Sequence, residues 1–300
     1  MYVVTGTTGN TGSVVANRLL AAGKKVRGIC RSAQRMQWLA EKGGEPFVAD
    51  LTDTKTLDAA FAGAEGVYVM LPPNLSSSDF RAHQDAMTES IAAALERSRV
   101  THAVTLSSIG ADKTEKTGPV VGLHRMEERF NRIAGLTVLH LRAGYFMENT
   151  LAQVEPIKKQ GMAMGPLAPE LKVAMIASRD IGAAAAEALL KRDFQSHQTR
   201  ELLGPREITM SECASIIGKA IGQRDLKYAQ PPEDQIGAAM QQMGMSADCV
   251  RLMLEMFGAL NSGYMKPLEA RSARNTTPTT YETYVQQEFL QQYRSSKIAA

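Results

Sequence analysis

Short runs of β-branched and other apolar residues alternate with stretches of helical periodicity along the first half of the chain. Such runs are typical of strands in a parallel sheet that is covered on both faces, and the stretches between them predict the covering helices. The expected strands are 2–5, 25–30, 46–49, 66–71, 103–106 and 137–141. The expected helices are one directly after the first strand and others near 33–42, 56–61 and 79–97. The pattern therefore predicts an α/β fold with a doubly wound parallel sheet.

The pattern becomes irregular after Asn149, where glycines and prolines predict loops. Helical periodicity then returns in separate segments. The expected helices are 180–191, 211–221 and 281–293. Thr209 and Glu212 form a capping box that opens the second of them. A methionine-rich stretch over 225–275 precedes the third. We expect two domains. The first is residues 1–150, joined by a returning helix at about 178–192. The second is a smaller, mostly helical carboxyl lobe formed by about 151–177 and 200–300.

Composition excludes several classes of protein. A chain of 300 residues with 44% hydrophobic residues can bury a large core. A net charge of +3 without a long basic run argues against direct binding of nucleic acid. Because no stretch approaches the roughly 18 apolar residues of a membrane span and the start does not resemble a signal peptide, we expect a cytoplasmic protein without a membrane partner. Cys30, Cys213 and Cys249 are far apart, which predicts reduced thiols and no metal site.

A glycine-rich turn, Gly6-Thr7-Thr8-Gly9-Asn10-Thr11-Gly12, joins the first strand to the helix that follows it. Glycines let the backbone approach pyrophosphate oxygens, and the first N–H groups of the helix face the negative charge. A lone Gly-x-x-Gly-x-x-Gly also occurs in ordinary loops, but the position between a strand and an amphipathic helix is what a dinucleotide-binding motif requires. We predict a Rossmann fold in which the pyrophosphate contacts Gly6, Thr8, Gly9, Asn10, Thr11 and Gly12.

Basic residues follow the second strand, where an NAD enzyme commonly has an acidic residue for the ribose 2′-hydroxyl. Arg31 comes directly after this strand and Arg35 one turn later. A guanidinium can hold a 2′-phosphate through charge-assisted hydrogen bonds, whereas a carboxylate would repel it. We therefore expect NADP(H) to be preferred over NAD(H), the alternative being that both arginines are solvated surface residues.

Two more turns lie at strand ends. Asp50 follows the third strand, from which it could reach the adenine ring or instead cap the next helix. Leu71 and Pro72 end the fourth strand, and the Leu71-Pro72-Pro73 turn could form a wall of the cofactor site or be only a rigid turn.

Several blocks of the sequence together resemble the NmrA-like group of atypical short-chain dehydrogenases/reductases. They are the glycine turn, Arg31, 71–73, 106–111, His124-x-x-x-Glu128, 142–149, 180–182, 202–205 with Thr209-x-x-Glu212, and 278–280. The resemblance covers nearly the whole chain and implies a Rossmann domain with a small, split substrate lobe. Members of the group include NADPH-dependent quinone and azo-dye reductases, and also redox-sensing regulators that bind the dinucleotide without turning it over.

The resemblance also indicates that a catalytic side chain of ordinary short-chain reductases is missing here. Ordinary short-chain reductases use a Tyr-x-x-x-Lys pair, and the corresponding residues here are Val120 and His124. A valine cannot move a proton, which puts the usual carbonyl mechanism in doubt. His124 could contact the nicotinamide ribose or protonate a reduced product, or it could be a helix-surface residue held by Glu128 at i+4. Ser107, at the end of the fifth strand, is expected to contact the cofactor.

The end of the sixth strand carries the other candidates. Tyr145 and Phe146 could wall off the nicotinamide, and Asn149 could hydrogen-bond its carboxamide or the substrate. The alternative is core packing with a helix cap. The methionines between Met240 and Met265 could line an adaptable apolar pocket, although methionines at helical spacing more often belong to the core. We include Phe146, Asn149 and Met240 in the expected substrate pocket.

These observations lead to one main hypothesis, which is an NADPH-dependent reductase that transfers hydride to a flat, electron-poor small molecule such as a quinone or an azo compound. The competing class is a non-enzymatic NADP(H)-binding redox sensor that acts through a protein partner. An epimerase-like or lyase-like enzyme is disfavoured because such enzymes need the residues that are lost here. We expect a monomer or a homodimer.

Overall fold

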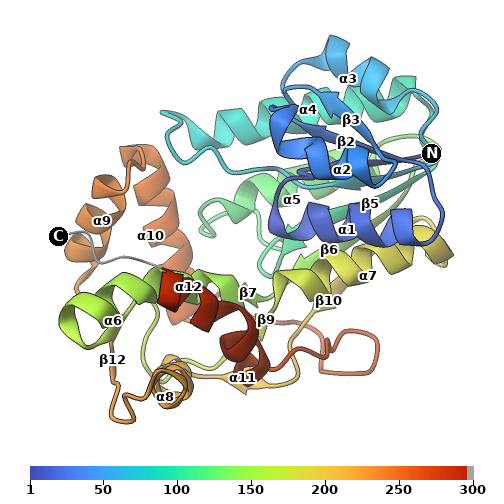
Figure 1. The fold of residues 1–300 in the computed structure, drawn as a ribbon. Helices are drawn as coiled ribbons and strands as arrows, with labels where there is room; N and C mark the ends of the chain where they lie inside the picture. Colours follow the sequence, from blue (N-terminus) through green and yellow to red (C-terminus); the bar gives the residue numbers. More distant parts are fainter. Residues whose placement is uncertain (296–300) are drawn as a thin grey trace.

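The computed structural model describes residues 1–295, and its centre is a seven-stranded parallel sheet in the order β10-β6-β5-β4-β1-β2-β3 (Figure 1). The strands are β1 (Tyr2–Thr5), β2 (Val26–Cys30), β3 (Glu45–Val48), β4 (Gly66–Val69), β5 (His102–Ser108), β6 (Thr137–Ala143) and β10 (His197–Leu202). The chain builds outward from β1 to β3 on one side and from β4 to β10 on the other, so the order reverses between β1 and β4. Ligands of open α/β sheets bind outside the carboxyl ends of the strands at such a reversal.

Helices cover both faces of this sheet because side chains alternate in direction along each strand. The helices are α1 (Asn10–Ala21), α2 (Gln37–Glu41), α3 (Thr54–Phe61), α4 (Phe80–Arg97), α5 (Val120–Asn131) and α7 (Ser178–Lys191). Val3 packs in one core with residues of α3, α4 and α5, whereas its neighbour Val4 packs in a second core with residues of α1 and α7. The predicted doubly wound α/β fold is therefore confirmed.

Strand β10 is an element that the hydrophobic pattern does not predict. Its sequence from His197 to Leu202 is mostly polar, and it pairs only with β6 at the edge of the sheet. Its buried residues are Glu201 and Leu202 at its carboxyl end, and the Glu201 carboxylate accepts hydrogen bonds from the N–H groups of Leu268 and Glu269. The helix expected over 33–42 is also different, because it is divided into a short 3-10 turn (Gln34–Met36) and α2.

The carboxyl lobe is mostly helical, as expected, and it adds short strands. Its strands are β7 (Tyr145–Phe146), β9 (Val173–Ile176) and β11 (Glu207–Ile208) in one sheet and β8 (Ala163–Met164) and β12 (Tyr228–Ala229) in another. Its helices are a 3-10 helix (Met147–Gln153), α6 (Val154–Gln160), α8 (Met210–Ile221), α9 (Glu233–Gln242), α10 (Ala247–Asn261), α11 (Tyr281–Tyr284), a π-helix (Val285–Phe289) and α12 (Leu290–Ser295). The capping box of Thr209 and Glu212 at the start of α8 is confirmed. The domain boundaries near 150 and 178–192 stay a prediction.

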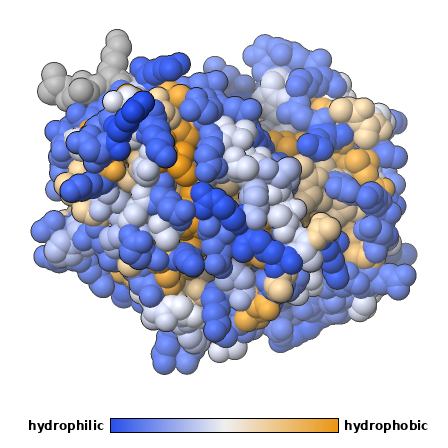
Figure 2. Space-filling view, turned by 90° about the horizontal axis from the view of Figure 1, so that it is seen from below, coloured by the Kyte–Doolittle hydropathy of each residue, from blue (hydrophilic) through white to orange (hydrophobic). Residues whose placement is uncertain are grey.

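The lobe contacts the sheet domain, where the N–H of Phe80 at the start of α4 donates to Asp248 Oδ2 in α10 at 2.9 Å. Figure 1 shows α9 and α10 on the side of the sheet opposite the N-terminus. The face drawn in Figure 2 is mostly hydrophilic, with apolar residues in narrow strips and small patches. Within residues 1–295, no helix combines the length and the apolar character needed to cross a membrane.

Candidate functional site

The turn between β1 and α1 has no room for a side chain at Gly6 or Gly12. Gly6 has a φ of 61°, and the N–H of Gly9 donates to the carbonyl of Gly6 at 2.9 Å. A Cβ on Gly12 would lie 2.3 Å from the Gly6 oxygen, so a side chain at this position would push α1 away from the turn. The three glycines therefore bring the first turn of α1 directly against the carboxyl end of β1.

The N-terminus of α1 is suited to an anion. Its N-cap is Gly9, which has no side chain to occupy the first N–H groups, and the first turn contains no acidic residue. Such an end attracts phosphate through its N–H groups and its dipole. Asn10 is exposed and Thr8 is half-buried, so both side chains are accessible there, whereas Thr11 is buried and its hydroxyl accepts a hydrogen bond from Tyr68 of β4 at 2.9 Å. Thr11 thus fastens the helix to the sheet.

Two arginines stand beside the end of β2. Arg31 and Arg35 are exposed, and neither makes a hydrogen bond or an ion pair with another residue of the range 1–295. Asp50 lies near Arg31. Hydrogen bonds from the Thr52 backbone and hydroxyl, together with the charge of Arg31, hold the pKa of the Asp50 carboxyl below its usual value. This corner of the site therefore has two cations and one fixed anion.

The alternative role of Asp50 as a helix cap is wrong. The N-cap of α3 is Asp53, whose carboxylate accepts hydrogen bonds from the backbone N–H groups of Lys55 and Thr56. Asp50 instead accepts from the Thr52 backbone at 2.9 Å and so closes the turn that precedes the helix. The two aspartates have similar positions in the sequence, and only the start of α3 distinguishes them.

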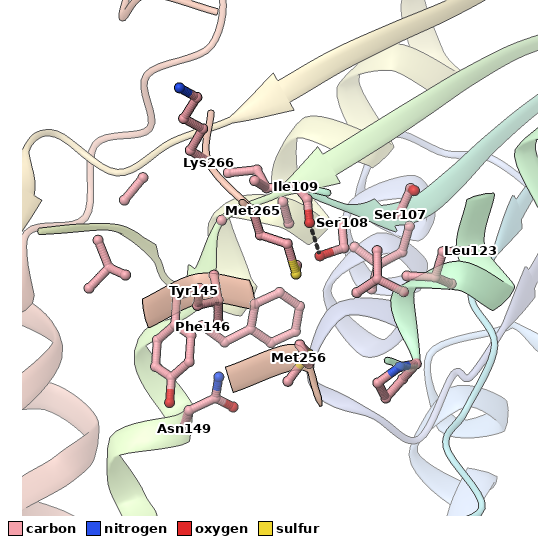
Figure 3. Close-up of a pocket in the computed structure, with 18 of the residues that line it drawn as sticks. Ser107, Ser108, Ile109, Leu123, Tyr145, Phe146, Asn149, Met256, Met265 and Lys266 are labelled. Atoms are coloured by element: carbon pink, nitrogen blue, oxygen red, sulfur yellow. Dashed lines mark hydrogen bonds between the residues drawn. The ribbon is translucent and has the colours of Figure 1, made fainter. Parts of the chain in front are cut away.

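A cavity of about 420 Å³ lies between the carboxyl ends of the central strands and the carboxyl lobe (Figure 3). The sheet side contributes Leu71, Leu106 and Ser107, and Pro73 rather than Pro72 belongs to its lining among the described residues. The lobe side contributes Met253, Met256 and Met265. Most of this wall is apolar, and its size suits a small molecule together with one end of a cofactor.

The aromatic pair of β7 forms part of the cavity wall, as does Asn149. In Figure 3 the ring of Phe146 extends toward Met256 and Met265, and the phenol of Tyr145 lies next to the Asn149 amide. Burial raises the pKa of Tyr145. A hydrogen bond with Asn149 lowers this pKa, but by less than burial raises it. Tyr145 therefore keeps its proton near neutral pH.

Ser107 is the outermost member of a buried network. Its hydroxyl donates to Glu127 Oε1 at 2.5 Å, and Arg142 contacts both carboxylate oxygens of Glu127, with Nε at 3.0 Å and Nη2 at 2.5 Å. Because the hydroxyl proton is directed at Glu127, the Ser107 oxygen presents only lone pairs to the cavity. Sequence reasoning missed Glu127. The available signal was Arg142 in the mostly apolar strand β6, because a buried arginine needs a partner of opposite charge.

His124 lies beside the cavity and not in its described wall. Its Nδ1 is 2.9 Å from the carbonyl oxygen of Ala111, and α5 directs Val120 and Leu123 to the cavity in its place. The expected tether to Glu128 is wrong, because the Glu128 carboxylate pairs with Arg132 at 3.4 Å. The i+4 spacing permits a contact, but a longer arginine one turn further on takes the carboxylate.

Met240 is also outside the cavity lining. It is buried in α9, and of the methionines in this stretch only Met253, Met256 and Met265 reach the cavity among residues 1–295. This cavity therefore does not support the expected place of Met240 in the substrate pocket, which stays a prediction. Helical spacing shows that methionines share a face, but it does not show which face meets the sheet.

The family model of the NmrA-like family matches residues 2–290. The chain belongs to the NmrA-like family. Among its NmrA-like relatives is the NAD(P)H azoreductase of Xenophilus azovorans, which is 28% identical over 267 residues, or 88% of this chain and 89% of the relative.

Solved structures share the fold of this chain over nearly all of its length. The NADPH-dependent quinone oxidoreductase of Escherichia coli, complexed with NADPH, superposes with a TM-score of 0.80 at 23% identity and covers 96% of this chain and 100% of its own. The triphenylmethane reductase of Citrobacter sp., complexed with NADP(H), gives a TM-score of 0.77 at 19% identity over 96% and 99%. At these sequence identities the similarity shows a shared fold and nothing further about activity.

Proposed function

We propose that this NmrA-like protein is an NADPH-dependent reductase that delivers hydride to a flat, electron-poor acceptor such as a quinone or an azo compound. The main support is the position of the cavity, which adjoins the carboxyl ends of β4, β5 and β6 and has a largely apolar wall. Azo, quinone and dye reductases among the relatives point in the same direction. A cytoplasmic location stays a prediction.

The residues of the site fit a dinucleotide. Gly12 lets the first turn of α1 lie against the end of β1, and Gly9 leaves the first N–H groups of the helix uncovered for a pyrophosphate. Arg31 and Arg35 are free to hold a 2′-phosphate, which favours NADP(H) over NAD(H). When bound, the cofactor supplies the hydride.

The chain itself orients the reactants and excludes water. Leu71 and Phe146 supply apolar surface on either side of the cavity, and Ser107 offers a hydrogen-bond acceptor that Glu127 holds in place. Val120 has no ionisable group, and burial raises the pKa of Tyr145, which makes its phenol a weaker acid. In this proposal the reduced acceptor therefore takes its proton from solvent, which suits acceptors that gain hydride before they are protonated.

A second candidate function is a redox sensor that binds NADP(H) and signals to a protein partner. Val120 favours the sensor, because it has no ionisable group at the position where ordinary short-chain reductases have their proton-donating tyrosine. The two functions differ in turnover. A reductase oxidises NADPH many times per protein molecule, whereas a sensor binds NADPH and leaves its absorbance unchanged.

Anaerobic stopped-flow absorbance at 340 nm tests the proposal, first with NADPH alone and then with a panel of quinones and azo dyes. We expect multiple turnovers with at least one acceptor. The matched control is Gly9→Trp, because the φ of −95° at Gly9 suits any residue while an indole would cover the pyrophosphate position. Tight binding of NADPH without oxidation would reject the reductase and favour the sensor.

A further inference from the structure

Gln84 is a buried amide in the wall of the cavity with no hydrogen-bond partner among residues 1–295. It lies in the first half of α4, its exposed fraction is 5%, and it belongs to the cavity lining. Its Oε1 atom is fully buried without a hydrogen-bond partner, and neither amide atom bonds any residue of 1–295. Buried amides are nearly always hydrogen-bonded, because an unsatisfied one lowers the stability of the fold. An amide left in this state at a cavity is suited to a ligand.

The fold makes room for this amide. A Cβ on Gly122 of α5 would lie 2.2 Å from Gln84 Oε1 and 2.6 Å from Gln84 Cδ, so any larger residue at position 122 would displace the side chain. Gly122 is two residues after Val120, which lines the same cavity. The amide therefore stands beside the segment of α5 where an ordinary short-chain reductase has its proton-donating tyrosine.

The other groups around Gln84 cannot replace it as a hydrogen-bond donor. Phe80, Val120 and Leu123 of the same wall are apolar, and the proton of Ser107 is already directed at Glu127. A carboxamide carries two donors and one acceptor on a planar group that can turn over. It is thus a neutral donor in an apolar wall, which is the usual way in which a small-molecule site fixes the orientation of its ligand.

We propose that Gln84 determines the specificity of the acceptor site, donating a hydrogen bond from its amide to the carbonyl oxygen or azo nitrogen of the acceptor. This inference rests on the proposed reductase function. When hydride joins the acceptor, the acceptor gains two electrons and one hydrogen, and its new negative charge collects on that oxygen or nitrogen. The Gln84 N–H stabilises this charge without losing its proton, and solvent then supplies the one proton that completes the product.

The first test measures binding without turnover. Isothermal titration calorimetry of the NADP⁺-saturated protein compares 1,4-naphthoquinone with 1,4-dimethylnaphthalene, which has a similar shape and no carbonyl group. The variant is Gln84→Met, which keeps the length of the side chain and removes the amide. We expect the variant to bind the quinone about tenfold more weakly, the loss of one hydrogen bond, and to bind the hydrocarbon at least as well as the wild type.

A matched control separates this effect from damage to α4. Thr88 lies one turn further along the helix, is also buried with an unpartnered hydroxyl, and is outside the cavity lining. Thr88→Val should leave the affinity for both ligands unchanged. Thermal unfolding should show that Gln84→Met is at least as stable as the wild type, because the amide makes no bond inside the protein that the variant could lose.

Three results would overturn the inference: an equal loss of affinity for quinone and hydrocarbon in Gln84→Met, a loss of NADPH affinity in the same variant, or unchanged quinone binding. The first would show a change of shape only, and the second would assign the amide to the cofactor. Failure of the proposed function is a different observation, since it is the absence of NADPH oxidation by the wild type. A quinone-selective effect of Gln84→Met in a protein that does not turn over NADPH would keep Gln84 as a carbonyl-binding residue.

Discussion

The two sides of the cavity use their polar groups in different ways. On the sheet side, the Ser107 hydroxyl donates to the buried Glu127–Arg142 pair, so it has one fixed direction. On the lobe side, methionines form the wall, and Lys172 and Lys266 extend into solvent without an ion pair within residues 1–295. The sheet side is thus held rigidly by the protein, whereas the lobe side can adapt.

This difference matches the two tasks of a reductase that uses a single cofactor for various acceptors. A cofactor has one shape, and fixed hydrogen-bonding groups orient it at little entropic cost. Acceptors differ in shape, and unbranched methionine side chains can repack around them. The comparison predicts that substitutions in the Ser107–Glu127–Arg142 network or at the cofactor-binding strand ends affect stability and cofactor selectivity. Substitutions of the lobe side, or of the unpartnered Gln84, should instead affect the choice of acceptor.

The largest effect is expected on the stability of the protein, when the buried ion pair of Glu127 and Arg142 is broken. Glu127→Gln removes the charge that compensates Arg142, whose side chain is 15% exposed against 5% for Glu127. Breaking a buried pair in this way typically reduces the free energy of unfolding by about 3–5 kcal/mol. Urea denaturation followed by circular dichroism measures the loss.

The adjacent residue provides the control. Glu128 pairs with Arg132 at 3.4 Å on the surface, with its side chain 53% exposed, so Glu128→Gln should change the free energy of unfolding by less than about 1 kcal/mol. Equal effects of the two substitutions would mean that the buried network contributes no more than a surface pair. The sheet side would then not be the rigid one.

A smaller effect is expected on cofactor selectivity, when Arg31 beside the proposed 2′-phosphate position is replaced. Arg31→Asp should lower the affinity for NADPH relative to NADH by about 10- to 100-fold, since charge-assisted hydrogen bonds are lost and a repulsion is added. Fluorescence titration with both reduced cofactors measures the ratio. Arg224→Asp, at an exposed arginine of the carboxyl lobe, makes the same change of charge away from the site and should leave the ratio unchanged. An unchanged ratio in Arg31→Asp would assign the 2′-phosphate to other groups.

The sheet and the glycine turn could be predicted from the sequence because both depend on local patterns. The short apolar run of β1, which is buried along its whole length, and the spacing of Gly6, Gly9 and Gly12 are properties of neighbouring residues. Strand β10 was not predictable in this way, since its polar sequence becomes a strand only by pairing with β6.

The cavity wall was less predictable because it joins residues that are distant in the sequence. Ser107, Glu127 and Arg142 come from three elements, and the sequence pointed to Glu128 in place of Glu127 because i+4 spacing is visible and burial is not. Met240 shares helical spacing with the cavity methionines but lies in α9, whereas Met253 and Met256 lie in α10. Gln84 carried no signal in the sequence, since only its missing partner makes it notable.

The smallest effect is expected on the adaptable side, and it should depend on the charge of the acceptor. Lys172 and Lys266 stand exposed at the edge of the cavity, and Figure 3 shows the Lys266 ammonium directed away from the Phe146 ring toward the outside. A sulfonated azo dye would gain a surface ion pair there, which corresponds to about 0.2–1 kcal/mol or up to fivefold in affinity. Lys266→Ala with Lys172→Ala should therefore raise KM for the sulfonated dye about two- to fivefold at low salt, and leave KM for its neutral analogue unchanged. Steady-state kinetics at low and high ionic strength measure both. If KM rose equally for the two dyes, the lysines would shape the wall rather than attract charge, and the lobe side would be more rigid than the comparison requires.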